Sequence, residues 1–336
     1  MGLIGAGMWG ETHARTYSEH PQAKFVAVAD VIEERAKAIA KKYGAQSYYK
    51  DYKDMLRNPE VEAVAVVVPD YLHREPAVDA ANAGKHLLVE KPLATTVEDA
   101  EAIVTATKDA GVKLMVDFHN RWNPPFAAAK DAIDKGELGA PLLLYMRHNN
   151  SIKVPTEMLT WLAKSSSIVF WLGSHSVDLV RWLVGDEVEQ VYSVSRSRVL
   201  PSKGFKNEDF FISILEFRRG AVATVENAWM LPNTLPVLGD FIAEIVGDKG
   251  SMRMTIVGNN CVDKATETGY TQPDALIFPT VHGKAKGFAG ESIVHFIECV
   301  AENRQPMATG EDGLAVTKIL CAIRDSARTK RIVRIE

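Results

Sequence analysis

Cysteine is scarce in this sequence, and long apolar runs are missing from it. The three cysteines, Cys261, Cys299 and Cys321, are odd in number, far apart and free of CxxC spacing. This pattern argues against a disulfide framework and against a zinc site, so we expect reduced thiols and no bound metal. No run approaches the roughly 18 apolar residues that span a bilayer, and no charged stretch precedes an apolar segment as in a secretory signal. We therefore expect a cytoplasmic protein that has no membrane partner.

The sequence also lacks an excess of positive charge. It carries 39 Lys and Arg residues against 43 Asp and Glu residues, a net charge of −4, and the basic residues are scattered. A protein that binds a phosphate backbone needs a basic stripe, so nucleic acid is not an expected partner. The 336 residues, of which 46% are hydrophobic and 24% charged, suit a folded chain with two domains.

The first third alternates short apolar runs with amphipathic stretches. The apolar runs are Gly2–Ile4, Phe25–Ala29, Ala63–Val68, His86–Val89 and Lys113–Val116. Such alternation predicts βαβ units and a doubly wound parallel sheet of the Rossmann type. The segment that starts at Asn120 breaks the rhythm. We therefore expect a Rossmann domain over residues 1–118 and a second α/β domain over residues 119–336.

The second domain is expected to contain a large, open-faced and mostly antiparallel sheet. Its predicted strands are Leu142–Arg147, Val188–Ser197, Phe210–Phe217, Ala221–Ala228, Phe241–Val246 and Ser251–Ile256. Predicted helices over Ile168–Val184, Phe288–Asn303 and Glu311–Thr329 would cover one face of this sheet, because a half-apolar sheet must bury that face. Residues 257–287 are rich in glycine and polar residues and are expected to form a loop.

A glycine-rich element, Gly5-Ala6-Gly7-Met8-Trp9-Gly10, follows the first apolar run and opens a helix. In dinucleotide-binding folds the first glycine permits a tight turn, the second lets the backbone approach a pyrophosphate, and the third allows close helix–strand packing. The helix N-terminus offers N–H groups and a positive dipole end to that phosphate. A glycine-rich turn without a ligand is the alternative for this element taken alone. The residues that we assign to cofactor binding here are Gly5, Gly7, Met8, Trp9 and Gly10.

An acidic residue supports the dinucleotide interpretation. Asp30 ends the second predicted strand, about 20 residues after Gly10, which is the spacing of the carboxylate that holds an adenosine ribose. A carboxylate accepts hydrogen bonds from the two ribose hydroxyls but repels a 2′-phosphate. We therefore expect NAD rather than NADP as cofactor, although Arg35 lies close enough in the sequence to soften that preference.

Two more segments follow predicted strands, at the sheet edge where ligands bind in doubly wound folds. The strand Ala63–Val68 leads to Pro69 and His73, and the strand His86–Val89 leads to Glu90-Lys91-Pro92. Lys91 stands where the nicotinamide ring is expected, although a solvated charge is the alternative for a lysine that begins a loop. The residues assigned to the cofactor site from these segments are Val68, Pro69, His73, Glu90, Lys91 and Pro92.

The order of these motifs resembles the Gfo/Idh/MocA family of oxidoreductases. The glycine-rich element, Glu90-Lys91-Pro92 and the segment Gly173-Ser174-His175-Ser176-Val177-Asp178 occur in the order that this family shows. The resemblance covers essentially the whole chain, including Arg121-Trp122-Asn123-Pro124. It implies an open-faced α/β second domain that supplies the substrate wall, and a homodimer or homotetramer formed through the sheet of that domain.

The resemblance also implies a reaction. A hydride would pass from a hydroxyl-bearing carbon of a sugar, cyclitol or sugar derivative to NAD, with Lys91 positioning the reacting oxygen and His175 accepting its proton. Family dehydrogenases commonly have an aspartate four residues before this histidine, where it can orient the ring. Here that residue is Trp171. An indole cannot accept a proton, so either another acceptor serves His175 or the chemistry is altered.

Other residues are candidates for the substrate wall. They are Arg121 and Asn123 at the domain junction, His148 and Asn150 at a strand end, Asp178 after His175, and the tryptophans Trp161 and Trp171. Polar side chains could bind the hydroxyls of a polyol, and indoles could pack against a sugar ring. Ordinary strand-end polar residues and core tryptophans are the alternatives.

Two other functions remain compatible with the sequence. One is a non-catalytic regulatory member of the family that binds NAD and a sugar, which the presence of Trp171 favours. The other is a glycoside-processing enzyme that uses NAD only transiently. Retention of Lys91 and His175 favours the dehydrogenase.

Overall fold

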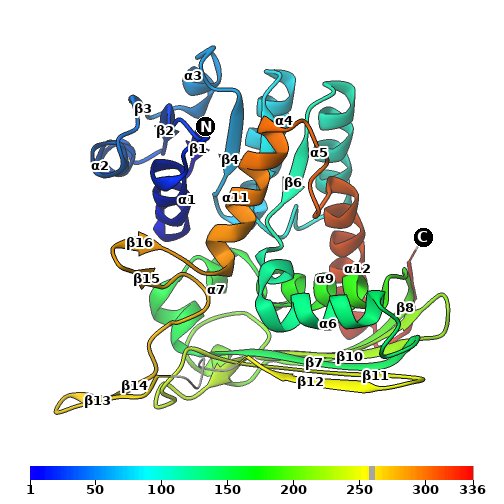
Figure 1. Cartoon of the computed structure of the whole chain (residues 1–336). Helices are drawn as coiled ribbons and strands as arrows, with labels where there is room; N and C mark the ends of the chain where they lie inside the picture. The colour runs from blue at the N-terminus through cyan, green and yellow to red at the C-terminus, as the bar shows by residue number, and fades with distance from the viewer. Residues whose placement is uncertain (257–261, 336) are drawn as a thin grey trace. The chain divides into compact units, whose positions relative to one another are not determined.

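The computed structural model describes residues 1–256 and 262–335, so Cys261 lies outside the described residues. The chain divides into two compact units. The first contains Met1–His119 and Ile277–Thr317, and the second contains Asn120–Leu276 and Lys318–Glu336. Residues 277–317 thus belong to the first unit although they lie between two segments of the second along the chain, and Figure 1 shows β15, β16 and α11 of this stretch in orange.

The first unit is built on a six-stranded parallel sheet of order β3-β2-β1-β4-β5-β6. The strands are β1 (Gly2–Ile4), β2 (Ala27–Ala29), β3 (Ser47–Tyr49), β4 (Ala63–Val66), β5 (His86–Val89) and β6 (Leu114–Val116). The predicted doubly wound Rossmann sheet is confirmed, because this strand order reverses between β1 and β4. Only β3 was missed, since it is a partly exposed edge strand without an apolar run.

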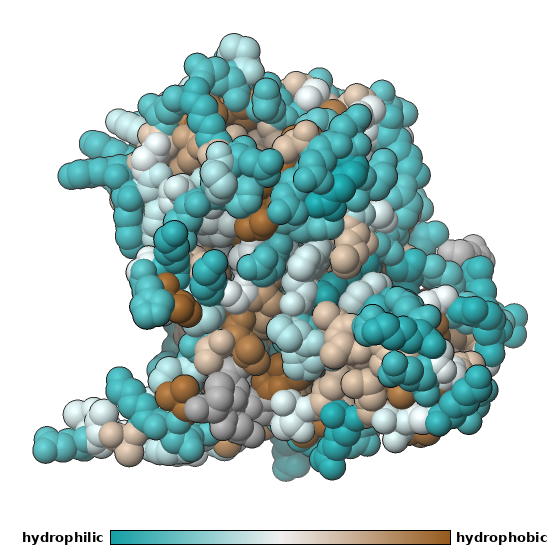
Figure 2. All heavy atoms as spheres, in the orientation of Figure 1, coloured by the Kyte–Doolittle hydropathy of each residue, from teal (hydrophilic) through white to brown (hydrophobic). Residues whose placement is uncertain are grey.

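Helices and turns surround the parallel sheet. They are α1 (Met8–Glu19), α2 (Glu33–Tyr43), α3 (Tyr52–Leu56), η1 (Asp70–Leu72), α4 (Arg74–Asn82), α5 (Val97–Asp109), α11 (Phe288–Ala301) and the first part of α12 (Gly310–Thr329). A hairpin of β15 (Thr280–Val281) and β16 (Lys284–Ala285) contacts α1. On the face drawn in Figure 2, hydrophilic side chains cover most of the helices of this unit, which agrees with apolar faces turned inward to the sheet.

One helix contradicts the prediction. We expected the segment that contains α11 to cover the antiparallel sheet, but α11 packs against α1 and β5 of the parallel sheet. Its buried side chains include Ile293, Phe296 and Ile297. Apolar periodicity identifies which face of a helix is buried, but it does not identify the sheet that buries it.

The second unit is built on a seven-stranded sheet of order β12-β11-β7-β10-β9-β8-β17, in which only the β7–β10 pair is parallel. The strands are β7 (Pro141–Ser151), β8 (Val188–Arg196), β9 (Phe210–Phe217), β10 (Val222–Leu231), β11 (Gly239–Gly247), β12 (Ser251–Thr255) and β17 (Val333–Arg334). The mostly antiparallel sheet is therefore confirmed. Along β9, Phe211, Leu215 and Phe217 are buried, and the alternate residues Ile212 and Ile214 are exposed.

The helices of this unit are α6 (Pro124–Asp134), α7 (Leu162–Ser165), α8 (Ile168–Trp171), α9 (Gly173–Val184), α10 (Val199–Ser202) and the end of α12, with further turns at η2 (His119–Trp122) and η3 (Val154–Met158). The predicted helix over Ile168–Val184 is wrong as a single element, because it consists of α8 and α9. They meet at Gly173, where an added Cβ would lie 3.3 Å from both Asn227 and Leu320. A glycine within an apolar helical pattern is a signal for such a change of direction.

Of the predicted loop over residues 257–287, residues 257–261 lie outside the described residues, and residues 262–287 contain more structure than expected. Besides β15 and β16, they form a hairpin of β13 (Lys264–Thr266) and β14 (Gly269–Thr271). Strands of two or three residues are too short to produce a detectable alternation. Among the described residues, no helix has both the length and the apolar character that crossing a bilayer requires.

Candidate active site

The glycine-rich loop is shaped by three glycines with different roles. Gly5 has a φ of 103°, and an added Cβ would lie 2.1 Å from the carbonyl oxygen of Val67. A Cβ at Gly10 would lie 2.1 Å from the carbonyl oxygen of Gly5, so close packing requires glycine at both positions. Gly7 immediately precedes α1. Unlike the other two glycines, it has open space around it, because no described atom lies within 4 Å of a Cβ added there. The backbone at Gly7 is therefore open to an anionic group at the helix N-terminus.

The side chain of Asp30, which follows β2, is hydrogen-bonded to this loop. Its Oδ2 accepts a hydrogen bond of 2.8 Å from the N–H of Ala6, and its Oδ1 accepts one of 2.8 Å from Ile32. A carboxylate offers about four lone-pair sites, so acceptor capacity remains for ribose hydroxyls. Beyond Asp30, Val31 is 81% exposed and Ile32 is 46% exposed, an apolar surface suited to an adenine ring. The residues present thus fit a dinucleotide.

His73 links the two loops that follow β4 and β5. One ring nitrogen lies 2.8 Å from the carbonyl oxygen of Pro92 and the other lies 3.0 Å from that of Val68. Burial lowers the pKa of His73. Of the predicted cofactor residues, the structure brings Val68, His73 and Pro92 together, with His73 acting as a link between loops.

Lys91 is buried and is the second residue after β5. Burial lowers the pKa of its ammonium to about 8, while the carboxyl groups of Glu90, Asp70 and Asp117 act in the opposite direction. The side chain is therefore largely charged at neutral pH but acidic for a lysine. Such a group can donate a hydrogen bond to an oxygen that gains negative charge.

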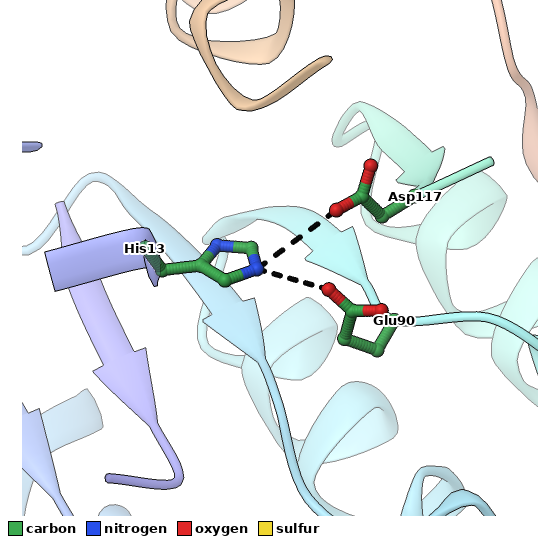
Figure 3. A group of neighbouring side chains, drawn as sticks. All are labelled: His13, Glu90 and Asp117. Atoms are coloured by element: carbon green, nitrogen blue, oxygen red, sulfur yellow. Dashed lines mark hydrogen bonds and ion pairs between the residues drawn. The ribbon is translucent and has the colours of Figure 1, made fainter. Parts of the chain in front are cut away.

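Beside Lys91 lies a buried cluster of His13, Glu90 and Asp117, shown in Figure 3. Nε2 of His13, on α1, lies 3.0 Å from Oε1 of Glu90 and 3.9 Å from Oδ2 of Asp117. The other ring nitrogen, Nδ1, lies 3.1 Å from the hydroxyl of Tyr17. A neutral ring satisfies both contacts if Nε2–H donates to Glu90 and the hydroxyl of Tyr17 donates to Nδ1.

Burial shifts all three groups of this cluster toward their neutral forms. It lowers the pKa of His13 to about 4, raises the pKa of Glu90 to about 7 and raises the pKa of Asp117 well above its ordinary value. The ligand atoms lie within 4.8 Å of one another, a spacing that metal ligands also have. Both ring nitrogens of His13 already have hydrogen-bond partners, Tyr17 and Glu90.

In the second unit, His175 on α9 is buried beside Asn120 of η2. Nδ2 of Asn120 lies 3.0 Å from Nδ1 of His175. The ring of His148 on β7 lies 5.7 Å from that of His175 and stacks on Phe241 at 4.0 Å with an interplanar angle of 3°. The structure thus places the predicted residues His148 and His175 next to each other, on a wall that is partly aromatic.

Arg121 and Asp178 form a buried ion pair within the second unit. Nε of Arg121 lies 3.0 Å from Oδ2 of Asp178, and its Nη2 lies 2.6 Å from Oδ1. This two-point pair connects η2 with α9. Both residues were predicted to bind substrate, but in the structure these atoms bind each other.

The remaining predicted wall residues occupy different surroundings. The side-chain amide of Asn123 is buried and makes no hydrogen bond with the described part of the chain. Nδ2 of Asn150 lies 3.3 Å from the carbonyl oxygen of Asn149. Trp161 and Trp171 meet edge to face with ring centroids 5.9 Å apart, and Trp171 ends α8 rather than preceding His175 on one continuous helix.

Several residues of these sites were not predicted, among them Asp117, Asn120, His13 and Phe241. Asp117 directly follows β6, so the rule that drew attention to Glu90 after β5 would also have found it. Asn120 stands beside the predicted Arg121, but no sequence pattern connects it to His175. His13 and Phe241 carried no signal, because their roles depend on tertiary packing.

The fold and the first unit's site define a class of protein. A doubly wound sheet with a glycine-rich helix start and an acidic residue after β2 is the fold of dinucleotide-dependent oxidoreductases. Residues 1–118 match the NAD-binding Rossmann fold of the GFO_IDH_MocA oxidoreductase family, and residues 130–335 match its C-terminal alpha/beta domain. The chain belongs to this Gfo/Idh/MocA family of oxidoreductases, whose first domain is an NAD-binding Rossmann fold.

Relatives of known name extend over the whole chain. Myo-inositol 2-dehydrogenase of Thermotoga maritima is 28% identical, with 100% of this chain and 98% of the relative covered. The NAD(+)-dependent scyllo-inositol 2-dehydrogenase of Bacillus subtilis is 28% identical, with 99% and 95% covered. A levoglucosan dehydrogenase solved with NADH and levoglucosan is 26% identical with a TM-score of 0.84, covering 99% of this chain and 98% of its own.

Proposed function

We propose that this protein oxidises a hydroxyl of a cyclitol, sugar or sugar derivative with NAD, and that Lys91 and His175 carry out the proton chemistry. The observation that carries the proposal is the buried Lys91 after β5, whose pKa burial lowers to about 8. The names of the relatives, inositol and levoglucosan dehydrogenases, support the substrate class.

Each group has a defined task in this proposal. NAD supplies the acceptor for the hydride that leaves the carbinol carbon. Lys91 donates a hydrogen bond to the reacting oxygen and favours its negative charge as the O–H bond breaks. Nε2 of His175 accepts the hydroxyl proton, and returns it when the reaction runs toward the alcohol.

The second unit supplies the substrate wall in this proposal. His148, fixed by its stacking on Phe241, and the buried amide of Asn123 offer polar atoms for hydroxyl groups. The edge-to-face pair of Trp161 and Trp171 offers apolar surface for a sugar ring. We assign residues 1–118 to cofactor binding and residues 119–336 to substrate binding and assembly.

We also propose that the protein assembles as a homodimer or homotetramer through the open face of the seven-stranded sheet. Exposed apolar side chains on three of its strands support this, namely Leu143, Tyr192, Ile212 and Ile214. A cluster of exposed apolar residues on one face is typical of an interface. The lack of long apolar runs in the sequence supports a cytoplasmic location.

One observation favours a second function. Trp171 occupies the position of a residue that would orient His175 in related dehydrogenases, which favours a non-catalytic protein that binds NAD and a sugar. Such a protein would bind both ligands and produce no NADH.

A substrate screen distinguishes these functions. The purified protein is incubated with NAD and a panel of inositols, aldoses, anhydrosugars, glycosides and sugar acids at alkaline pH, because oxidation releases a proton, and NADH is followed by absorbance. We expect NADH from at least one cyclitol or sugar. Binding of NAD and a cyclitol by calorimetry without NADH would favour the regulatory function, and substrate conversion without net NADH would indicate transient use of NAD.

A further inference from the structure

Two buried contacts join η2 to α9. Asn120 approaches His175, and its neighbour Arg121 makes the two-point ion pair with Asp178. His175 and Asp178 are three residues apart on α9 and so share one face of that helix. The ion pair therefore fixes the backbone of η2 where the amide of Asn120 meets Nδ1 of His175.

The amide has a chemical property that a carboxylate lacks. Its nitrogen only donates hydrogen bonds and its oxygen only accepts them, whereas a carboxylate only accepts. With the amide nitrogen toward Nδ1, as placed here, the ring of neutral His175 carries its proton on Nε2. A half-turn of the amide brings its oxygen to Nδ1, which then holds the proton and leaves Nε2 able to accept another.

We infer that Asn120 is the positioning residue of His175, and that the side of its amide turned to Nδ1 sets the tautomer on which proton transfer at Nε2 depends. The inference rests on the proposed function of His175 as proton acceptor. The amide of Asn120 is then the group that orients the ring of His175 in this chain, where Trp171 ends α8. Because the amide is neutral, it orients the ring without stabilising the imidazolium as a carboxylate would.

Other charged groups around α9 are balanced by partners. Besides η2 and Leu320 of α12, the elements packed against α9 are α6, α8, β7 and β10. Their charged groups are bonded elsewhere: Lys130 to Asp134, Lys135 to Asp131, Arg147 to Asp240, and Glu226 to Asn149 and Tyr145. On α9 itself, Arg181 pairs with Glu187. The ring of His148 is titratable and lies 5.7 Å from that of His175, and its effect is common to every Asn120 variant.

Nitrogen-15 NMR of protein labelled at histidine tests the inference without turnover. His175→Gln identifies the His175 signals, and the shifts of Nδ1 and Nε2 report which nitrogen holds the proton. We expect one dominant tautomer in the unmodified protein, a changed ratio in Asn120→Ala, and a proton held on Nδ1 in the isosteric Asn120→Asp. Asn207→Ala is the matched control, because Asn207 is a buried amide of the same unit that bonds to the carbonyl oxygen of Ser166. It should leave the His175 signals unchanged.

Kinetics with the substrate found in the screen gives a second measure. Asn120→Ala should lower kcat about tenfold with KM changed less than about twofold, because orientation rather than binding is lost. Asn120→Asp should keep activity but move the acid limb of the kcat profile upward by about one pH unit, since a carboxylate favours the imidazolium.

Identical His175 nitrogen shifts in the unmodified protein, Asn120→Ala and Asn120→Asp would overturn the inference. So would an unchanged pH profile in Asn120→Asp. A fully active His175→Gln variant would instead contradict the proposed role of His175 as proton acceptor. The NMR result on the contact between Asn120 and His175 would remain valid in that case.

Discussion

One buried histidine in each unit can be compared by the side chains that surround it. His13 in the first unit faces two carboxyl groups, Glu90 and Asp117, and burial lowers its pKa to about 4. His175 in the second unit faces the neutral amide of Asn120. Nearby carboxyl groups thus do not make His13 a base, because burial lowers its pKa more than the charge of Asp117 raises it. We assign His13 to structure and His175 to chemistry, and each prediction below tests that contrast.

The largest expected effect is the loss of turnover at the groups assigned to chemistry. His175→Ala and Lys91→Ala should each lower kcat by about 10²-fold or more, while the affinity for NAD stays within a few-fold. His13→Gln should lower kcat far less. Steady-state kinetics and NAD titration check this, and the contrast breaks if His13→Gln is as damaging to kcat as His175→Ala.

Stability should respond in the reverse order. His13→Ala leaves the buried carboxyl of Glu90 without its 3.0 Å partner, which we expect to lower the free energy of unfolding by about 1–3 kcal/mol. Denaturant unfolding measures the change. His175→Gln keeps a hydrogen-bonding side chain beside Asn120 and should cost less than that, so equal losses would contradict the assignment.

The cluster around His13 should also give two opposing pH effects on stability. Folding raises the pKa of Glu90 from 4.5 to about 7, so the folded chain retains a proton that the unfolded chain loses, and stability falls as pH rises through that window. Folding lowers the pKa of His13 from 6.5 to about 4, so stability is lost as pH falls from 6.5 to 4. Between pH 4.5 and 6.5 the two trends oppose each other.

Single variants separate these trends. His13→Gln should make stability fall with rising pH relative to the unmodified protein, and Glu90→Gln should make it rise, each by roughly 1 kcal/mol per pH unit. Asp117 is present in both variants and cancels from their comparison. Unfolding midpoints measured from pH 4.5 to 6.5 check the signs, and slopes of the same sign would show that the two groups do not titrate as described.

The smallest effect concerns the aromatic surface of the second unit. Trp171→Ala should raise KM strongly, whereas Trp171→Phe should raise it only a few-fold, because part of the aromatic packing area is kept. Trp171→Asp would place a carboxylate in the second unit, comparable to the carboxyl groups that face His13 in the first. It should lower activity if the site needs an apolar wall. Higher activity in Trp171→Asp would favour a degraded catalytic site, and no response to any change would place Trp171 in the core.

The sequence predicted elements that depend on local pattern and failed where tertiary packing decides. The strands β1, β5 and β9 match their predicted ranges because apolar residues predominate in each of these runs. The sheet that α11 covers could not be predicted, since it depends on which distant segment lies opposite. The division between α8 and α9 had a signal, Gly173 within an apolar helical pattern, which the prediction overlooked. Asn120 and His175 are 55 residues apart, and no periodicity connects them.

Asp30 couples cofactor preference to the shape of the glycine-rich loop, and this limits how the preference can be engineered. NAD should bind much more tightly than NADP, and Asp30→Ala should narrow that difference in titrations of the two cofactors. The same substitution also removes the acceptor for the N–H groups of Ala6 and Ile32, so both cofactors should bind more weakly. A design aimed at NADP therefore needs a neutral side chain that still accepts these hydrogen bonds, such as asparagine or serine, before a basic residue is added for the 2′-phosphate.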